Sequence, residues 1–224
     1  MEKQQLNIAG REVILYEGDD PRCLIIHPTD SQEIQAMDSL ITLLKETGED
    51  FAMAVFQVSD WNGDLSPWPA DPVFGREGFA GEAAKTLEFV ERELVPKLKK
   101  AYDVPVIIGG YSLAGLFALW AGYQSNRFAA VAAVSPSVWF DGWKEYAENN
   151  RIKVKNVYLS LGDREEKTRN QRMARVGDNI RLQKQLLEAA GVRCALEWNP
   201  GNHFMDFDKR CAAGYNWCRR EITG

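Results

Sequence analysis

The stretch that decides the fold reads VPVIIGGYSLAG and spans residues 104–115. Its first eight residues, up to Tyr111, are largely apolar and rich in β-branched side chains, which predicts a strand buried on both faces of a sheet. An apolar helix is predicted from Leu113 to Tyr123. Ser112 therefore lies at the turn where a buried strand passes directly into a helix.

Small residues flank Ser112 on both sides. Gly109 and Gly110 precede it, and Ala114 and Gly115 follow it. A nucleophile on a tight strand–helix turn needs such neighbours, because its backbone is strained and bulky side chains would hold strand and helix apart. The usual pattern is G-x-S-x-G, and Ala114 replaces its last glycine. The hypothesis is a nucleophilic Ser112, and the alternative is a serine that caps the helix.

Short apolar strands and helical segments alternate on either side of this centre. Strands are predicted at residues 12–16, 23–27, 51–56, 104–111, 129–134, 154–161 and 193–198, and helices at 34–48, 79–96, 113–123, 170–190 and 206–220. We expect Pro96 to kink or end its helix, and residues 59–76 to form a long loop. The alternation predicts one α/β domain over residues 1–224, with a mostly parallel sheet covered by helices on both faces.

Composition excludes several classes of protein. The 224 residues are 45% hydrophobic and 26% charged, which is typical of a globular chain and not of a disordered one. With 27 basic and 32 acidic residues the formal net charge is −5, so neither nucleic acid nor an anionic membrane is an expected partner. No apolar run reaches the roughly 18 residues of a membrane span.

Two features favour a cytoplasmic location. The first five residues are polar and lead into no apolar segment of the kind that secretory signals contain. Cys211 and Cys218 lie seven residues apart on the same side of the predicted last helix, as thiols packed in a core would. Such cysteines are typical of a reducing compartment.

The chain contains only two histidines, His27 and His203. This number is too small for a His-rich zinc site, and the four cysteines form no C-x-x-C pair, so we predict neither a metal nor a cofactor. A serine nucleophile needs a base within hydrogen-bond reach, and in α/β-hydrolases the base follows the serine and the acid in the chain. His203, in a turn-rich loop before the last helix, meets this order. His27 precedes the serine, and we expect it to be structural.

The acid of such a site should follow the strand at residues 154–161. Three carboxylates do so in the sequence Gly162-Asp163-Arg164-Glu165-Glu166, and charge alone does not choose between them. Hydrolases of this fold often carry an acid three residues after such a glycine, which makes Glu165 the first choice and Asp163 the second. The alternative is an acidic surface patch paired with neighbouring basic residues.

An oxyanion hole would combine two backbone N–H groups. One belongs to Leu113, directly after the proposed nucleophile, and the other to the loop after the strand at residues 23–27. Pro28 has no N–H, which leaves Thr29, our first choice, or Asp30.

These motifs together resemble the Putative esterase family of α/β-hydrolases, which includes esterase D, feruloyl esterases and enterochelin-type siderophore esterases. The resemblance extends over residues 23–220 and rests on GGYSLAG at 109–115, SPSVW at 135–139, LGDREE at 161–166 and GNHF at 201–204. It implies an α/β-hydrolase fold without a large cap domain and hydrolysis of a small-molecule carboxylic ester, without a metal, through an acyl-serine intermediate. Ser112 would be the nucleophile and His203 the base.

The sequence differs from the family pattern at two places, and two functions other than ester hydrolysis stay open. His27-Pro28-Thr29-Asp30 replaces the usual His-Gly-Gly-type loop, and residues 60–68 match no well-studied branch. Thioester hydrolysis or acyl transfer would use the same machinery, and a catalytically silent homologue would only bind a ligand.

Three tryptophans in loops near the predicted site are candidates for the substrate pocket. Trp61, Trp68 and Trp139 follow strands whose ends should face Ser112. Their alternative role is to seal the core beneath long loops.

Overall fold

The computed structural model describes residues 1–30, 33–48, 50–73, 75–101 and 103–223. Its centre is an eight-stranded sheet with the order β1-β2-β4-β3-β7-β8-β9-β10. The strands are β1 (Glu2–Ile8), β2 (Arg11–Glu17), β3 (Leu24–Thr29), β4 (Ala52–Gln57), β7 (Val106–Tyr111), β8 (Ala130–Val134), β9 (Asn156–Gly162) and β10 (Arg193–Asn199). The β1–β2 and β2–β4 pairs are antiparallel, and the other pairs are parallel. The predicted mostly parallel sheet is confirmed.

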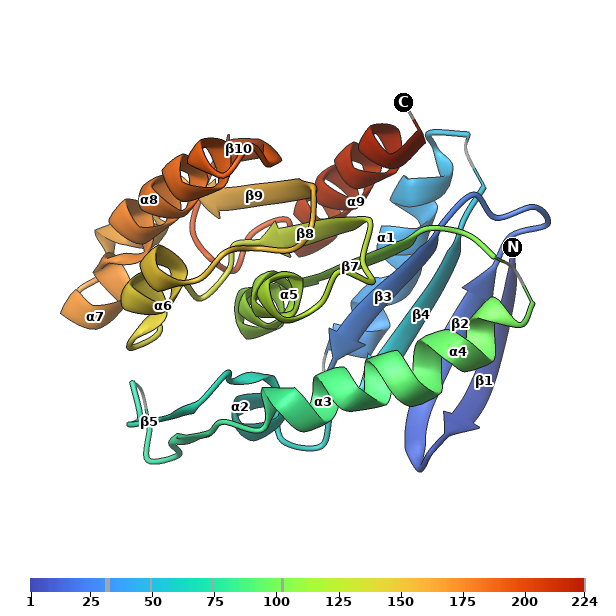
Figure 1. Cartoon of the computed structure of the whole chain (residues 1–224), viewed down its shortest axis with the longest axis horizontal. Helices are drawn as coiled ribbons and strands as arrows, with labels where there is room; N and C mark the ends of the chain where they lie inside the picture. The colour runs from blue at the N-terminus through green and yellow to red at the C-terminus, as the bar shows by residue number, and fades with distance from the viewer. Residues whose placement is uncertain (31–32, 49, 74, 102, 224) are drawn as a thin grey trace.

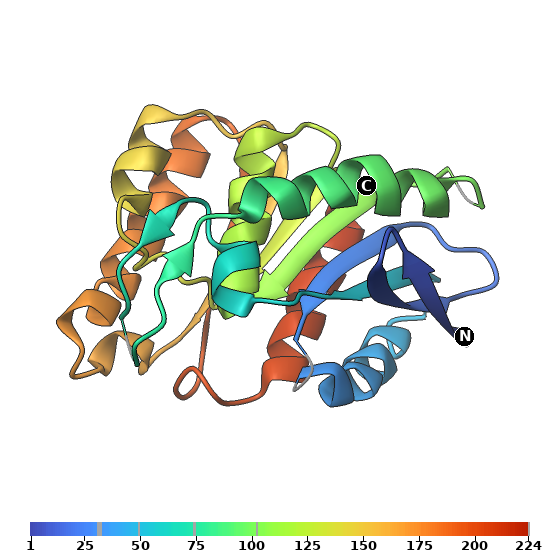
Figure 2. The same ribbon diagram turned by 90° about the horizontal axis from the view of Figure 1, so that it is seen from below.

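Helices cover both faces of the sheet (Figures 1 and 2). On one face, α1 (Met37–Lys45), which follows the 3-10 turn η1 (Glu33–Ala36), packs with α9 (Phe207–Thr223). On the other face lie α5 (Ser112–Gln124) and α8 (Val176–Ala189). The strands separate two cores, since Ile25 and Ile107 belong to the first and Ile26 and Ile108 to the second. This alternation explains why the central strands β3, β4, β7 and β8 are largely apolar on both faces.

The helix α5 is buried along almost its whole length. Every residue from Leu113 to Tyr123 is buried, so the helix has no polar face. A helix of this composition is stable only inside the molecule, which fixes Ser112 at its first position next to the sheet. Within the described residues, no helix has both the length and the apolar character needed to cross a bilayer.

Pro96 does not end its helix. The chain continues from α3 (Ala83–Phe89) through a π-helical turn, η2 (Val90–Leu94), into α4 (Val95–Lys99). In this turn the Val95 N–H bonds to the carbonyl of Val90, five residues earlier. The wider turn accommodates a proline that would clash with a regular helix, so the expectation of a helix end is wrong and that of a local distortion holds.

The other differences lie in polar or aromatic segments. The polar strand β1 was not predicted, because only Leu6 and Ile8 of this edge strand pack against the core. The described part of residues 59–76 holds α2 (Trp61–Leu65) and β5 (Pro69–Ala70), which pairs with β6 (Phe79–Ala80). The segment after β8 ends in α6 (Trp143–Asn149), which was not predicted, and the helix predicted at 170–190 is divided into α7 (Gln171–Ala174) and α8.

Replacing Gly110 by alanine tests the close approach of β7 and α5. A methyl group there would lie 2.6 Å from the Cβ of Ala114 and 2.7 Å from its carbonyl carbon. Backbone cannot move aside as a side chain can, so we expect Gly110→Ala to lower the free energy of unfolding by about 1–3 kcal/mol in urea denaturation. Gly122→Ala, in α5, is the control, because its methyl group would lie 3.0 Å from a valine methyl group and not from backbone. Equal stability of the two variants would contradict this packing.

Candidate active site

The candidate site lies at the carboxyl ends of the parallel strands. β7 leads into Ser112, β8 into Ser135, β9 into Glu165 and β10 into the loop that carries His203. Parallel strands bring these ends to one edge of the sheet, where α/β proteins place their functional groups. Residues up to 91 positions apart in the sequence therefore meet in one place.

Ser112 has the strained backbone of a nucleophile elbow. Its φ is +57°, a left-handed conformation that residues other than glycine rarely adopt. Two glycines make the turn possible. A methyl group on Gly110 would meet Ala114, and one on Gly115 would lie 2.9 Å from the carbonyl oxygen of Val134. The approach of strand and helix thus depends on these two glycines, and the buried Ala114 occupies the position where the usual pattern has glycine.

Ser112, His203 and Glu165 form one hydrogen-bonded chain. The Ser112 Oγ lies 2.9 Å from Nε2 of His203, and Nδ1 of His203 lies 2.7 Å from Oε2 of Glu165. The carboxylate can only accept a hydrogen bond, so Nδ1 carries the proton and Nε2 accepts the hydroxyl proton of Ser112. The imidazole is therefore oriented to receive that proton.

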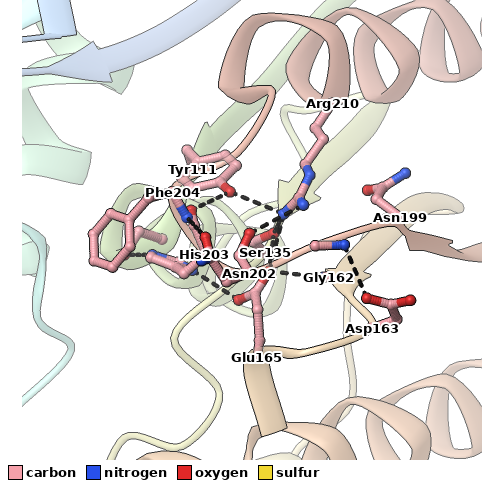
Figure 3. Close-up of polar contacts among 12 residues, drawn as sticks. Tyr111, Ser135, Gly162, Asp163, Glu165, Asn199, Asn202, His203, Phe204 and Arg210 are labelled. Carbon is pink, nitrogen blue, oxygen red and sulfur yellow. Dashed lines mark hydrogen bonds and ion pairs between the residues drawn. The ribbon is translucent and has the colours of Figure 1, made fainter. Parts of the chain in front are cut away.

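The second oxygen of Glu165 is also fully engaged (Figure 3). Oε1 accepts hydrogen bonds from the Gly162 N–H at 2.7 Å, the Ser135 hydroxyl at 2.9 Å and Nη1 of Arg210 at 3.1 Å. The side chain is 5% exposed. These donors compensate the cost of burying the carboxylate.

Asp163, the second choice for the acid, lies elsewhere. Its side chain is exposed, and Oδ1 accepts a hydrogen bond from the Gly201 N–H at 2.8 Å. It thus holds the loop that carries His203 without contacting the imidazole. The geometry favours Glu165.

Arg210 and Tyr111 also belong to this hydrogen-bonded network, although neither was predicted from the sequence to contribute to the site. The Tyr111 hydroxyl donates to the carbonyl of His203 at 2.7 Å, and burial raises its pKa to about 12. Arg210 lies three residues after Phe207, on the apolar face of α9, and is 2% exposed. An arginine on an apolar helix face needs a buried acceptor, and this signal could have identified it.

A cavity of about 310 Å³ lies beside Ser112. Trp61 and Trp139, two of the three predicted pocket tryptophans, line it together with Phe79 and Val176. Trp68 does not line it. Its indole N–H donates to the carbonyl of Asp141, and its ring packs against Phe140, Trp143 and Tyr146. The expected pocket role of Trp68 is therefore replaced by core packing, because its ring faces the aromatic segment after β8.

The backbone N–H of Thr29 points away from Ser112. Thr29 pairs with Gln57 of β4, and its carbonyl accepts from the Val58 N–H at 2.9 Å. The N–H and C=O of one strand residue point to the same side, so this N–H faces β4, whereas Ser112 follows β7 on the other side of β3. The next residue, Asp30, lines a hollow together with Ser112. The geometry therefore favours Asp30 over Thr29. Leu113, the other expected donor, lines the 310 Å³ cavity beside Ser112.

His27 is completely buried and does not reach Ser112. Nδ1 lies 2.6 Å from the Tyr215 hydroxyl, and among the described residues Nε2 has no hydrogen-bond partner. Burial lowers the pKa of His27 to about 3. It is therefore a neutral structural side chain at physiological pH, as its position before Ser112 suggested.

The sheet order and the chain order of Ser112, Glu165 and His203 place the protein among the α/β-hydrolases. Similar solved structures include an IroE-like serine hydrolase from Shewanella oneidensis (TM-score 0.75, 16% identity, covering 99% of this chain and 80% of that chain). The siderophore hydrolase EstA from Aspergillus nidulans is also similar (TM-score 0.69, 17% identity, covering 98% of this chain and 94% of that chain). A third is the enterobactin esterase FES from Shigella flexneri (TM-score 0.72, 17% identity, covering 99% of this chain and 58% of that chain).

Membership of a family follows from a match in sequence. The model of the Putative esterase family matches residues 32–210, so the chain belongs to this family and is a carboxylic-ester hydrolase. No curated protein matches the chain.

The depressed pKa of His27 predicts a pH dependence of stability. The unfolded chain binds a proton at this residue below about pH 6.5 and the folded chain only below about pH 3. Between these values folding excludes the proton, so stability falls as the pH falls, by up to about 1.4 kcal/mol per pH unit from this group. We expect His27→Gln to flatten the acid side of the curve of unfolding free energy against pH. Parallel curves for variant and wild type would contradict the assignment.

Proposed function

We propose that the protein hydrolyses small-molecule carboxylic esters through an acyl-serine intermediate, with Ser112, His203 and Glu165 as a catalytic triad. The observation that carries the proposal is the hydrogen-bonded chain from the Ser112 hydroxyl through both imidazole nitrogens to the buried Glu165 carboxylate. It supplies a nucleophile, a base and an orienting acid in the order that serine hydrolysis needs.

In the first half of the reaction, the Ser112 oxygen attacks the ester carbonyl while Nε2 of His203 takes its proton. The imidazolium carries a positive charge, which the Glu165 carboxylate stabilises at Nδ1. The oxyanion accepts hydrogen bonds from the backbone N–H groups of Leu113 and Asp30. The carbonyl then re-forms, the C–O bond to the alcohol breaks, and His203 gives its proton to the leaving oxygen.

In the second half, water replaces the alcohol. His203 removes a proton from the water as it attacks the acyl-serine carbonyl, and returns that proton to the Ser112 oxygen as the acid departs. The cavity beside Ser112 is lined mainly by apolar side chains, among them Trp61, Trp139 and Val176. It favours an ester whose bound part is apolar.

The proposal includes a cellular location and a domain organisation. We place the protein in the cytoplasm, where its thiols stay reduced. Cys23, Cys211 and Cys218 are buried, and no disulfide occurs among the described residues. Within the described residues, β1–β4 and β7–β10 form one sheet against which helices pack, which supports a single domain over residues 1–224.

Three substitutions test the triad with aryl acetate or butyrate esters. Ser112→Ala should remove nearly all turnover, by about 10⁴-fold or more. Glu165→Gln should lower kcat by about 10²–10⁴-fold, because its amide can donate to Nδ1 and favours the wrong tautomer. Asp163→Asn should stay within about tenfold of wild type, since Asp163 contacts only the loop backbone. Circular dichroism checks that each variant is folded. The reverse ranking of the two acids would move the assignment to Asp163.

A further inference from the structure

We propose that Arg210 is a positioning residue for the reaction, whose guanidinium sets the relative placement of Glu165, His203 and the strand that ends at Ser112. The inference rests on the proposed function, because it concerns the geometry of the triad. Arg210 touches neither Ser112 nor the cavity beside it, so its effect is exerted through other residues.

The guanidinium lies between four separate segments of the chain (Figure 3). Nη1 donates to Glu165 Oε1 at 3.1 Å, after β9, and to the Tyr111 hydroxyl at 3.2 Å, at the end of β7. Ser135, after β8, lies 3.4 Å from the same nitrogen. Nη2 donates to the carbonyls of Pro200 and Asn202, at 2.9 and 3.1 Å. These two carbonyls belong to the loop that carries His203.

The directions of these hydrogen bonds leave little freedom. Tyr111 gives its hydroxyl proton to the carbonyl of His203, and Ser135 gives its own to Glu165. Both hydroxyl oxygens therefore act as acceptors toward Arg210, which has only donors to offer. Reversing any one bond would leave a buried polar atom without a partner, so one arrangement of acid and imidazole is selected.

Charge gives Arg210 a second effect. Its side chain is 2% exposed and that of Glu165 is 5% exposed, so each charge compensates the other away from water. Lysine could replace the charge, but a single ammonium group could not span the carboxylate and two carbonyls as the planar fork does. We therefore expect Arg210→Lys to recover only part of the function.

The first test compares Arg210→Met with Arg219→Met. Arg219 lies in the same helix and is 1% exposed, and its Nη1 bonds to the Leu44 carbonyl, the Thr47 hydroxyl and Asn216, far from the triad in these contacts. Both variants lose a buried arginine. A displacement of about 1 Å at a reacting group can cost about 10²-fold, so we expect kcat of Arg210→Met to fall by about that factor with KM within about threefold. Arg219→Met should keep kcat within about threefold.

The second test asks whether Arg210 acts through Glu165. If it does, Arg210→Met should lower kcat little further in a Glu165→Gln background, because the group that it positions has already been disabled. Independent, multiplying losses would contradict this route. Equal kcat values for Arg210→Met and Arg219→Met, at comparable thermal stability, would reduce Arg210 to a structural role.

A readout without substrate separates this inference from the proposed function. The ¹⁵N chemical shifts of the imidazoles report which nitrogen carries the proton, and the chain has only His27 and His203 to assign. We expect His203 to be protonated at Nδ1 in wild type and Arg219→Met, and to show mixed tautomers in Arg210→Met, with His27 unchanged. An unaltered His203 spectrum in Arg210→Met would overturn the inference, even if ester hydrolysis were never detected. Absence of hydrolysis by wild type would instead contradict the proposed function.

Discussion

The arrangement of the site depends on the burial of one carboxylate, that of Glu165. A charge removed from water is stable only when donors surround it, and here the donors are His203, Gly162, Ser135 and Arg210. They come from the carboxyl end of β9, from the segments after β8 and β10, and from the last helix. The loops can therefore pack against the sheet only in the arrangement that satisfies the carboxylate. Folding itself orients the imidazole toward Ser112 before any ester arrives, which is preorganisation in the physical sense.

Much of the fold follows from the hydrophobic pattern of the sequence. The strand from Val106 to Tyr111 and the helix after it are apolar on all sides, and only the centre of a two-sided α/β sheet can bury them. The polar strand β1 was not predicted because its position at the sheet edge depends on pairing with β2 rather than on its own composition. The sequence left open whether Pro96 kinks or ends its helix, because the π-helical turn that accommodates the proline is a rare conformation with no strong sequence signal.

Site residues could be predicted where neighbouring residues or chain order identify them, and not where only three-dimensional contacts do. The turn at Ser112 and the chain order of His203 are visible in the sequence, and the structure brings the two within 2.9 Å. The choice between Glu165 and Asp163 depends on which carboxylate turns inward, which spacing can suggest but not establish. The direction of one N–H decides against Thr29, and strand register sets that direction. The role of Arg210 depends on contacts with segments that are distant in the sequence, which only the structure reveals. Its position on an apolar helix face indicated only that it needs a buried partner.

We propose Ser112 as the nucleophile and His203 as the base that activates it. The most direct measurement is reaction of the native protein with a small fluorophosphonate, followed by intact-mass analysis and peptide mapping. We expect one adduct per chain, on Ser112, formed with loss of fluoride and much more slowly in folded His203→Ala. A native protein that stays unmodified by probes small enough for the 310 Å³ cavity, or that carries the adduct on another residue such as Ser137, would contradict it.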